Sequence, residues 1–123
     1  MKKLNIGFFA DGKWAHKTLS FLLIDKDIKI SFICLRYKFP DKFLEQEAIN
    51  KKIDLLKQAD INNNEFVQKI SSYNCDLFIS MSFNQIFKKS ILSLPKLGTI
   101  NCHASKLPFY RGRNILNWVL IND

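Results

Sequence analysis

Short apolar stretches alternate with amphipathic stretches along this chain of 123 residues. Residues 4–10 (LNIGFFA) are apolar and end at an Asp-Gly turn, and residues 28–35 (IKISFICL) are rich in β-branched side chains, so both are typical of buried strands. Between them, Trp14, Leu19 and Leu23 recur at helical spacing. The pattern predicts strands at 4–10, 28–35, 53–57, 75–82 and 98–104, and helices at 13–24, 41–52, 62–73, 84–94 and 113–123.

This alternation predicts one α/β domain over residues 1–123, with a mostly parallel sheet covered by helices on both faces. Right-handed crossovers then give a doubly wound, Rossmann-like sheet, which binds ligands at the carboxyl ends of its strands. The first strand is followed by FFADGKW and not by GxGxxG, which argues against an ordinary NAD-binding domain.

Charge narrows the class of partner. The formal net charge of +8 suits phosphates, nucleotides, nucleic acid or an acidic surface, although it also simply favours solubility. The lysines are scattered along the chain, which weakens the case for a nucleic-acid-binding face.

Cysteine usage and hydropathy indicate the compartment. The three cysteines show no CxxC spacing, and we expect buried free thiols in a reducing environment. No apolar stretch approaches the ~20 residues of a membrane span, and the basic amino terminus is interpreted as leading into a strand and not a signal peptide. We therefore expect a cytoplasmic protein without a membrane partner.

An Asn-x-His pair is the clearest candidate for chemistry. On a strand over 98–104, Asn101 and His103 share one face near the carboxyl end. A fixed amide donor can stabilise an oxyanion, and an imidazole can transfer a proton near neutral pH, so the pair suits acyl transfer. The alternative is a structural histidine near a strand end. His16 is expected on the surface of the first helix.

The segment that follows is rigid and basic. Pro108 fixes its own φ, and Gly112 permits a turn that other residues resist. Arg111 and Arg113 can hold a phosphate in a fork. The alternative is an ordinary strand-to-helix connection with solvated arginines.

The stretch LGTINCHASKLPFYRG strongly resembles the signature of the formyltransferases that use N10-formyltetrahydrofolate, in which Asn-x-His is followed by Ser-x-Leu-Pro-x-Tyr-Arg-Gly. The similarity is strong from Asp76 onward and weak at the start of the chain. It implies that Asn101 and His103 form the catalytic pair, that N10-formyltetrahydrofolate is the cosubstrate and that no metal is needed. The pterin would lie along Phe83, Gln85, Ile86, Phe87 and Leu92, largely against backbone groups, and Ser105, Lys106, Arg111 and Arg113 would shape the acceptor side.

Within the family, the residues after Gly112 look closer to sugar N-formyltransferases, because Arg113 and an Asn-Trp pair replace the small residues and proline of the tRNA enzymes. The implied acceptor is a nucleotide-linked amino sugar, such as dTDP-4-amino-4,6-dideoxyglucose. Lys13 and Trp14 would then face the sugar nucleotide; the alternative places Trp14 in the core and Lys13 in solvent.

The family's third catalytic residue, an aspartate, follows a later strand, and the sequence ends at Asp123 before that position. We therefore expect an incomplete amino-terminal domain with very low or no turnover, and the resemblance allows a homodimer in a full-length form. The alternatives are a methionyl-tRNA formyltransferase, a non-catalytic folate- or nucleotide-binding module and, least favoured, a nucleic-acid-binding domain.

Overall fold

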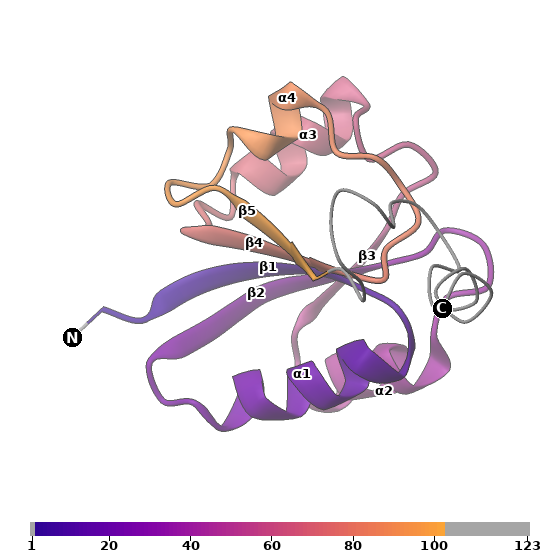
Figure 1. The fold of residues 1–123 in the computed structure, drawn as a ribbon, viewed down its shortest axis with the longest axis vertical. Helices are drawn as coiled ribbons and strands as arrows, with labels where there is room; N and C mark the ends of the chain where they lie inside the picture. Colours follow the sequence, from indigo (N-terminus) through magenta and orange to yellow (C-terminus); the bar gives the residue numbers. More distant parts are fainter. Residues whose placement is uncertain (1, 103–123) are drawn as a thin grey trace, which may run out of the picture.

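The computed structural model describes residues 2–102, which form one parallel five-stranded sheet between two layers of helices (Figure 1). The strands follow the order β3-β2-β1-β4-β5. Chain order reverses between β1 and β4, which is the topological switch of a doubly wound sheet. The elements are β1 (Leu4–Ala10), α1 (Gly12–Ile24), β2 (Ile28–Leu35), α2 (Lys42–Asn50), β3 (Asp54–Lys57), α3 (Asn64–Ser71), β4 (Leu77–Met81), α4 (Lys89–Leu92) and β5 (Thr99–Cys102). The predicted α/β fold is confirmed.

The two faces of the sheet carry separate cores. Helices α1 and α2 cover one face, and α3 and α4 cover the other (Figure 1). Alternate residues of β1 belong to the two cores, since Phe8 packs on the α1/α2 side and Phe9 on the α3/α4 side. The central strands are therefore apolar on both faces, as the near-continuous apolar runs predict.

Gly7 lies at a crowded position of the α3/α4 core. It pairs with Phe32 of β2 and Phe78 of β4, directly after a register shift in the β1–β2 ladder. A Cβ at this position would lie 2.4 Å from Phe32 Cζ and 2.8 Å from Phe78 Cδ1. Both rings are buried, so only glycine leaves room for them to close over β1.

The prediction of a helix over 84–94 is wrong for most of that range. Only Lys89–Leu92 is helical, and residues 83–87 form an irregular loop, which we call the β4 loop. Phe83 and Phe87 both pack against Phe9, at ring-centroid distances of 5.5 and 4.7 Å. This shared packing partner, together with side-chain hydrogen bonds to the loop backbone, outweighs a helical periodicity that is only local. The strand predicted over 98–104 is observed as Thr99–Cys102, and the helix predicted over 113–123 lies outside the described residues.

Candidate functional site

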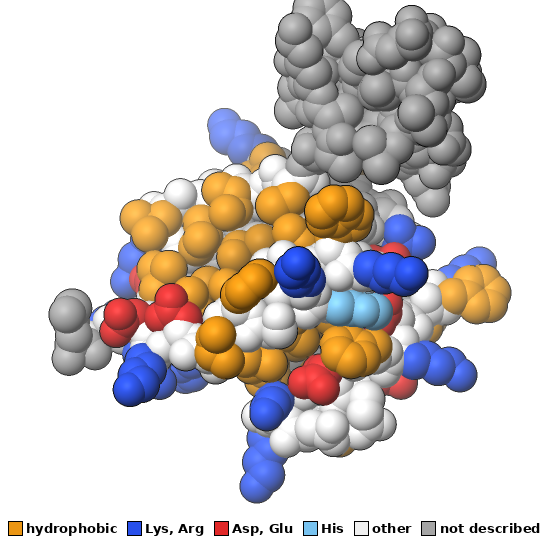
Figure 2. All heavy atoms as spheres, turned by 60° about the horizontal axis from the view of Figure 1, so that its bottom comes forward, with side chains coloured by type: hydrophobic (Ala, Val, Ile, Leu, Met, Phe, Trp, Pro, Cys, Tyr) orange, Lys and Arg blue, Asp and Glu red, His pale blue; other side chains and the backbone are white. Residues whose placement is uncertain are grey.

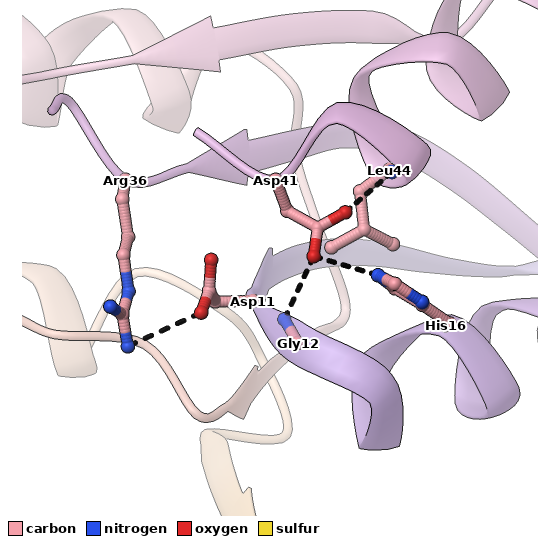
Figure 3. A network of polar contacts seen from close by, with 6 residues as sticks. All are labelled: Asp11, Gly12, His16, Arg36, Asp41 and Leu44. Carbon is pink, nitrogen blue, oxygen red and sulfur yellow. Dashed lines mark hydrogen bonds and ion pairs between the residues drawn. The ribbon is translucent and has the colours of Figure 1, made fainter. Parts of the chain in front are cut away.

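Polar residues gather at the carboxyl ends of β1 and β2, where Asp41 joins two segments (Figure 3). Asp41 Oδ1 accepts a hydrogen bond from the Leu44 N–H at 3.0 Å and so caps α2. Its other oxygen, Oδ2, accepts from the Gly12 N–H at 3.2 Å and from His16 Nε2 at 2.7 Å. The carboxylate therefore fills the amino-terminal end of α1, the position at which many α/β proteins bind an anion.

The sequence predicts His16 on the surface of α1. In the structure it is partly buried and pairs with Asp41. Its ring also stacks at a tilt on Phe43, with 4.4 Å between centroids. Helical periodicity placed His16 correctly on α1, but it carries no information about the loop after β2 that folds over it.

Arg36 connects three strand ends. Its guanidinium lies 3.3 Å from Asp11 Oδ2, after β1, and donates a hydrogen bond of 3.1 Å to the Ser82 carbonyl, after β4. Burial raises the pKa of Asp11, and the positive charge of Arg36 opposes that shift. The hydrogen bond from Arg36 to Ser82 therefore spans the topological switch, from the end of β2 past β1 to the end of β4.

Asp41 contributes a pH-dependent part of the stability. Burial alone would raise the pKa of this carboxyl, but the hydrogen bonds from Leu44, His16 and Gly12, together with the charge of His16, lower it below 3.8. A carboxyl whose pKa is lower in the folded state stabilises the fold above its ordinary pKa. That stabilisation disappears as the pH falls through the lowered value.

We expect Asp41→Ala to reduce the free energy of unfolding at pH 7 by about 2 kcal/mol, because a cap and two further hydrogen bonds are lost. Asp41→Asn can still cap α2 and should lose roughly half as much. Urea unfolding between pH 7 and pH 3 measures both losses, and the difference between wild type and Asp41→Asn should shrink below pH 4 or so. A pH-independent difference would contradict the assigned charge effect.

The β4 loop is anchored by alternate side chains. Phe83, Gln85 and Phe87 are partly buried, whereas Asn84 and Ile86 are exposed. Gln85 Oε1 accepts from the Ile61 N–H at 2.9 Å, and its Nε2 donates to the Gln58 carbonyl at 2.8 Å. Three of the residues predicted to bind the cosubstrate therefore hold the loop in place, while the side chain of Ile86 projects into solvent.

The strand register shows which face of the sheet Asn101 projects from. Asn101 pairs with Ser80 of β4, which in turn pairs with Phe9 of β1. Residues in register on parallel strands project from the same face, so Asn101 belongs to the α3/α4 side with Phe9. Asn101 is exposed near the carboxyl end of β5, which leaves its amide accessible to a ligand.

Other predicted site residues are spread more widely. Lys13 is exposed, and Trp14 is 67% exposed, which shows that the alternative placing Trp14 in the core is wrong. Leu92, at the end of α4, is 40% exposed. The remaining predicted site residues lie outside the described residues; they are His103, Ser105, Lys106, Arg111 and Arg113.

Sequence reasoning missed several polar residues at the carboxyl edge. Asp11 and Arg36 each follow a predicted strand directly, and this position was the available signal. Two contacts gave no signal in the sequence, because their partners lie far apart in the chain. They are the pairing of Asp41 with His16 and the hydrogen bond from Asn62 to the Ile86 carbonyl in the β4 loop.

Hydrophobic, basic and acidic side chains lie around His16 on the surface (Figure 2). Figure 2 shows this side, where hydrophobic and Lys or Arg side chains lie around the pale-blue histidine. Trp14, Tyr37, Phe39 and Phe43 are each at least half exposed. Exposed aromatic rings beside lysines can stack on planar rings of an anionic ligand.

The cysteines divide into two kinds. Burial raises the pKa of the Cys34 thiol to about 12, and burial, supported by the charge of Asp76, raises that of Cys75 to about 11. Both thiols are therefore unreactive at neutral pH. Cys102 is exposed, so the prediction of buried thiols is wrong for that residue, which lies on the outermost of the described strands.

The described part of the chain contains neither a membrane-spanning helix nor a cluster of metal-binding side chains. No helix within residues 2–102 has the length and apolarity needed to cross a membrane. The same residues contain no group of three His, Cys, Asp or Glu side chains suitably placed for a metal ion.

Comparison with known proteins gives one consistent result. Residues 33–122 match the model of the Formyl transferase family. A methionyl-tRNA formyltransferase of Clostridioides difficile is 43% identical over 79 residues, which are 64% of this chain and 26% of that protein. The bifunctional polymyxin resistance protein ArnA of Wigglesworthia glossinidia brevipalpis is 38% identical over 79 residues, 64% of this chain and 12% of that protein. The matched segment thus spans about a quarter of the first relative and about an eighth of the second.

Solved structures support the fold. A phosphoribosylglycinamide formyltransferase from Bacillus halodurans superposes with a TM-score of 0.78 at 14% identity, covering 97% of this chain and 66% of that one. A glycinamide ribonucleotide transformylase from Geobacillus kaustophilus gives a TM-score of 0.76 at 14% identity, covering 99% of this chain and 69% of the other.

Proposed function

The chain belongs to the formyl transferase family, and on that basis we propose that it provides the cosubstrate side of a formyl transfer site that uses N10-formyltetrahydrofolate. The observation that carries the proposal is the exposed Asn101 on the same sheet face as the packed aromatic residues of the β4 loop. An amide donor and an aromatic loop on one face of the sheet would suit an oxyanion and a flat heterocycle.

In the proposed reaction, the amine of the acceptor attacks the formyl carbon of the cosubstrate. A new carbon–nitrogen bond forms to the acceptor, the bond to N10 breaks, N10 gains a proton and the acceptor amine loses one. Asn101 would donate a hydrogen bond to the tetrahedral oxyanion. His103 would share this role and transfer the proton.

We propose a nucleotide-linked amino sugar as the acceptor, with dTDP-4-amino-4,6-dideoxyglucose as the test compound. The proposal is supported by Arg113 and the Asn-Trp pair after Gly112, and by the positive net charge. Lys13 and Trp14, exposed at the start of α1, would contact the nucleotide. Ser105, Lys106 and Arg111 would complete the acceptor side.

Transfer to a charged tRNA is the second candidate. The relative from Clostridioides difficile is named a methionyl-tRNA formyltransferase and is 43% identical over the matched segment. The residues after Gly112 favour the sugar nucleotide instead.

Calorimetry separates these functions. We expect the chain to bind 5-formyltetrahydrofolate, a stable analogue of the cosubstrate, and separately the dTDP-amino sugar. Binding of the folate alone would favour a binding module and contradict the sugar acceptor. Binding of methionyl-tRNA in place of the dTDP-amino sugar would favour the second candidate, and failure to bind the folate would contradict formyl transfer altogether.

A further inference from the structure

Two amide side chains fasten the β4 loop to the segment before α3 by reciprocal hydrogen bonds. Gln85, from the β4 loop, binds the backbone of Gln58 and Ile61. Asn62, from the other segment, donates to the Ile86 carbonyl at 2.8 Å and accepts from the Lys88 N–H at 2.9 Å. We call this pair of side chains the amide clasp.

The clasp fixes the orientation of both amides. Each side chain bonds a backbone N–H with its oxygen and a backbone carbonyl with its nitrogen. Rotating either amide by 180° would place donor against donor and acceptor against acceptor. The four bonds, each between 2.8 and 2.9 Å, therefore define one relative position of the two segments.

The clasp connects the loop to the rigid core. Ile61, whose N–H is bound by Gln85, is fully buried in the α3/α4 core. Asn63, directly after Asn62, caps α3 through the N–H groups of Glu65 and Phe66. Of these two neighbouring asparagines, Asn63 caps the helix and Asn62 binds the loop.

Several backbone groups of the clasped loop have no hydrogen-bond partner among the residues that the structure describes. Within residues 2–102, the backbone N–H and carbonyl groups of Phe83, Asn84, Gln85 and Phe87 make no hydrogen bond to another described residue. Their positions are nevertheless set, by the clasp on one side and by Phe9 on the other. A segment of fixed shape, whose backbone donors and acceptors are not bonded within the described residues, is preorganised to bind the polar edge of a flat heterocycle.

We propose that Asn62 and Gln85 are positioning residues for the folate cosubstrate, which act by holding the backbone of the β4 loop in its binding geometry. The inference rests on the proposed function, because it takes the loop as the pterin site. It assigns Gln85 a role through the backbone and not through contact with the ligand.

The test compares alanine variants with matched controls in the 123-residue chain. Asn62→Ala and Gln85→Ala each remove one half of the clasp. Asn64→Ala and Gln68→Ala remove the same residue types from exposed positions of α3, whose side chains make no hydrogen bond within the described residues. Calorimetric titration with 5-formyltetrahydrofolate gives the affinity of each variant, and thermal unfolding shows that it is folded at the titration temperature.

We expect each clasp variant to bind 5-formyltetrahydrofolate roughly ten-fold more weakly, because the loop must be ordered on binding. The controls should bind like wild type. Asn62→Asp keeps the acceptor for the Lys88 N–H but places a carboxylate oxygen against the Ile86 carbonyl, so it should bind as weakly as Asn62→Ala although its size is unchanged. A purely structural role would lower the melting temperature without changing the affinity of the folded protein.

Unchanged affinity in both clasp variants would overturn the positioning role while leaving the proposed function intact. Equal weakening in the matched controls would also overturn it. Failure of the wild-type chain to bind 5-formyltetrahydrofolate would contradict the proposed function and, with it, the positioning role.

Discussion

Replacing Asn101 with alanine is expected to lower the rate of formyl transfer by roughly two to three orders of magnitude, which is the usual loss when one oxyanion donor is removed. The amide is exposed near the carboxyl end of β5, and truncating an exposed side chain leaves the core unchanged. The loss should therefore fall on turnover, with little change in stability.

The measurement is the initial rate of formyl transfer from N10-formyltetrahydrofolate to the dTDP-amino sugar, in the protein as the cell makes it. Ile100→Ala is the matched control, because Ile100 neighbours Asn101 on β5 but pairs with Ile79, on the opposite face of the sheet. It should keep a near-normal rate. His103→Ala should lose turnover as Asn101→Ala does, and near-normal rates in both variants would refute the catalytic assignment.

The second large effect concerns folding. Gly7→Ala should reduce the free energy of unfolding by about 3 kcal/mol, at the upper end of the usual range for overpacking. The new methyl group would overlap the buried rings of Phe32 and Phe78, at 2.4 and 2.8 Å. These rings pack edge-to-face on Phe9 and on each other, so neither can move alone. Urea unfolding followed by circular dichroism measures the loss.

Two variants separate crowding from backbone preference. Gly12→Ala adds a methyl group where nothing lies within 4 Å, but the residue has φ +79°, so it should lose only about 1 kcal/mol through strain. Phe32→Leu shortens the side chain that the new methyl group meets, and the double variant Gly7→Ala/Phe32→Leu should be more stable than the sum of the two losses predicts. Strict additivity would show that crowding against Phe32 is not the cause.

Most of the fold was predictable from local pattern. The apolar runs at Leu4–Ala10 and Ile28–Leu35 were predicted with the bounds that the structure shows. Strands that are buried on both faces leave this signal because each residue needs to be apolar whichever face it meets. The prediction of a helix at the β4 loop was wrong for the opposite reason. The conformation of this loop depends on Phe9 and Asn62, which lie outside the local periodicity.

The candidate site was predictable only in part. The strand period places Asn101 on a defined face, and the family resemblance identified Asn101 and the β4 loop from their sequence motifs. The contacts of His16 and Gln85 were not predictable, because their partners lie 25 and 24 to 27 residues away in the chain. Nothing in the spacing of a polar side chain specifies a distant carbonyl or carboxylate.

The amino-acid order alone established the class of fold, the strand that carries Asn101 and the family motif, because these depend on short-range periodicity and on residue identity. Only the folded chain brought Asp41 to His16, Arg36 to Ser82 and Asn62 to the β4 loop. Such contacts form where parallel crossovers bring the carboxyl ends of separate strands to one edge of the sheet, so they are properties of the topology and not of any single segment.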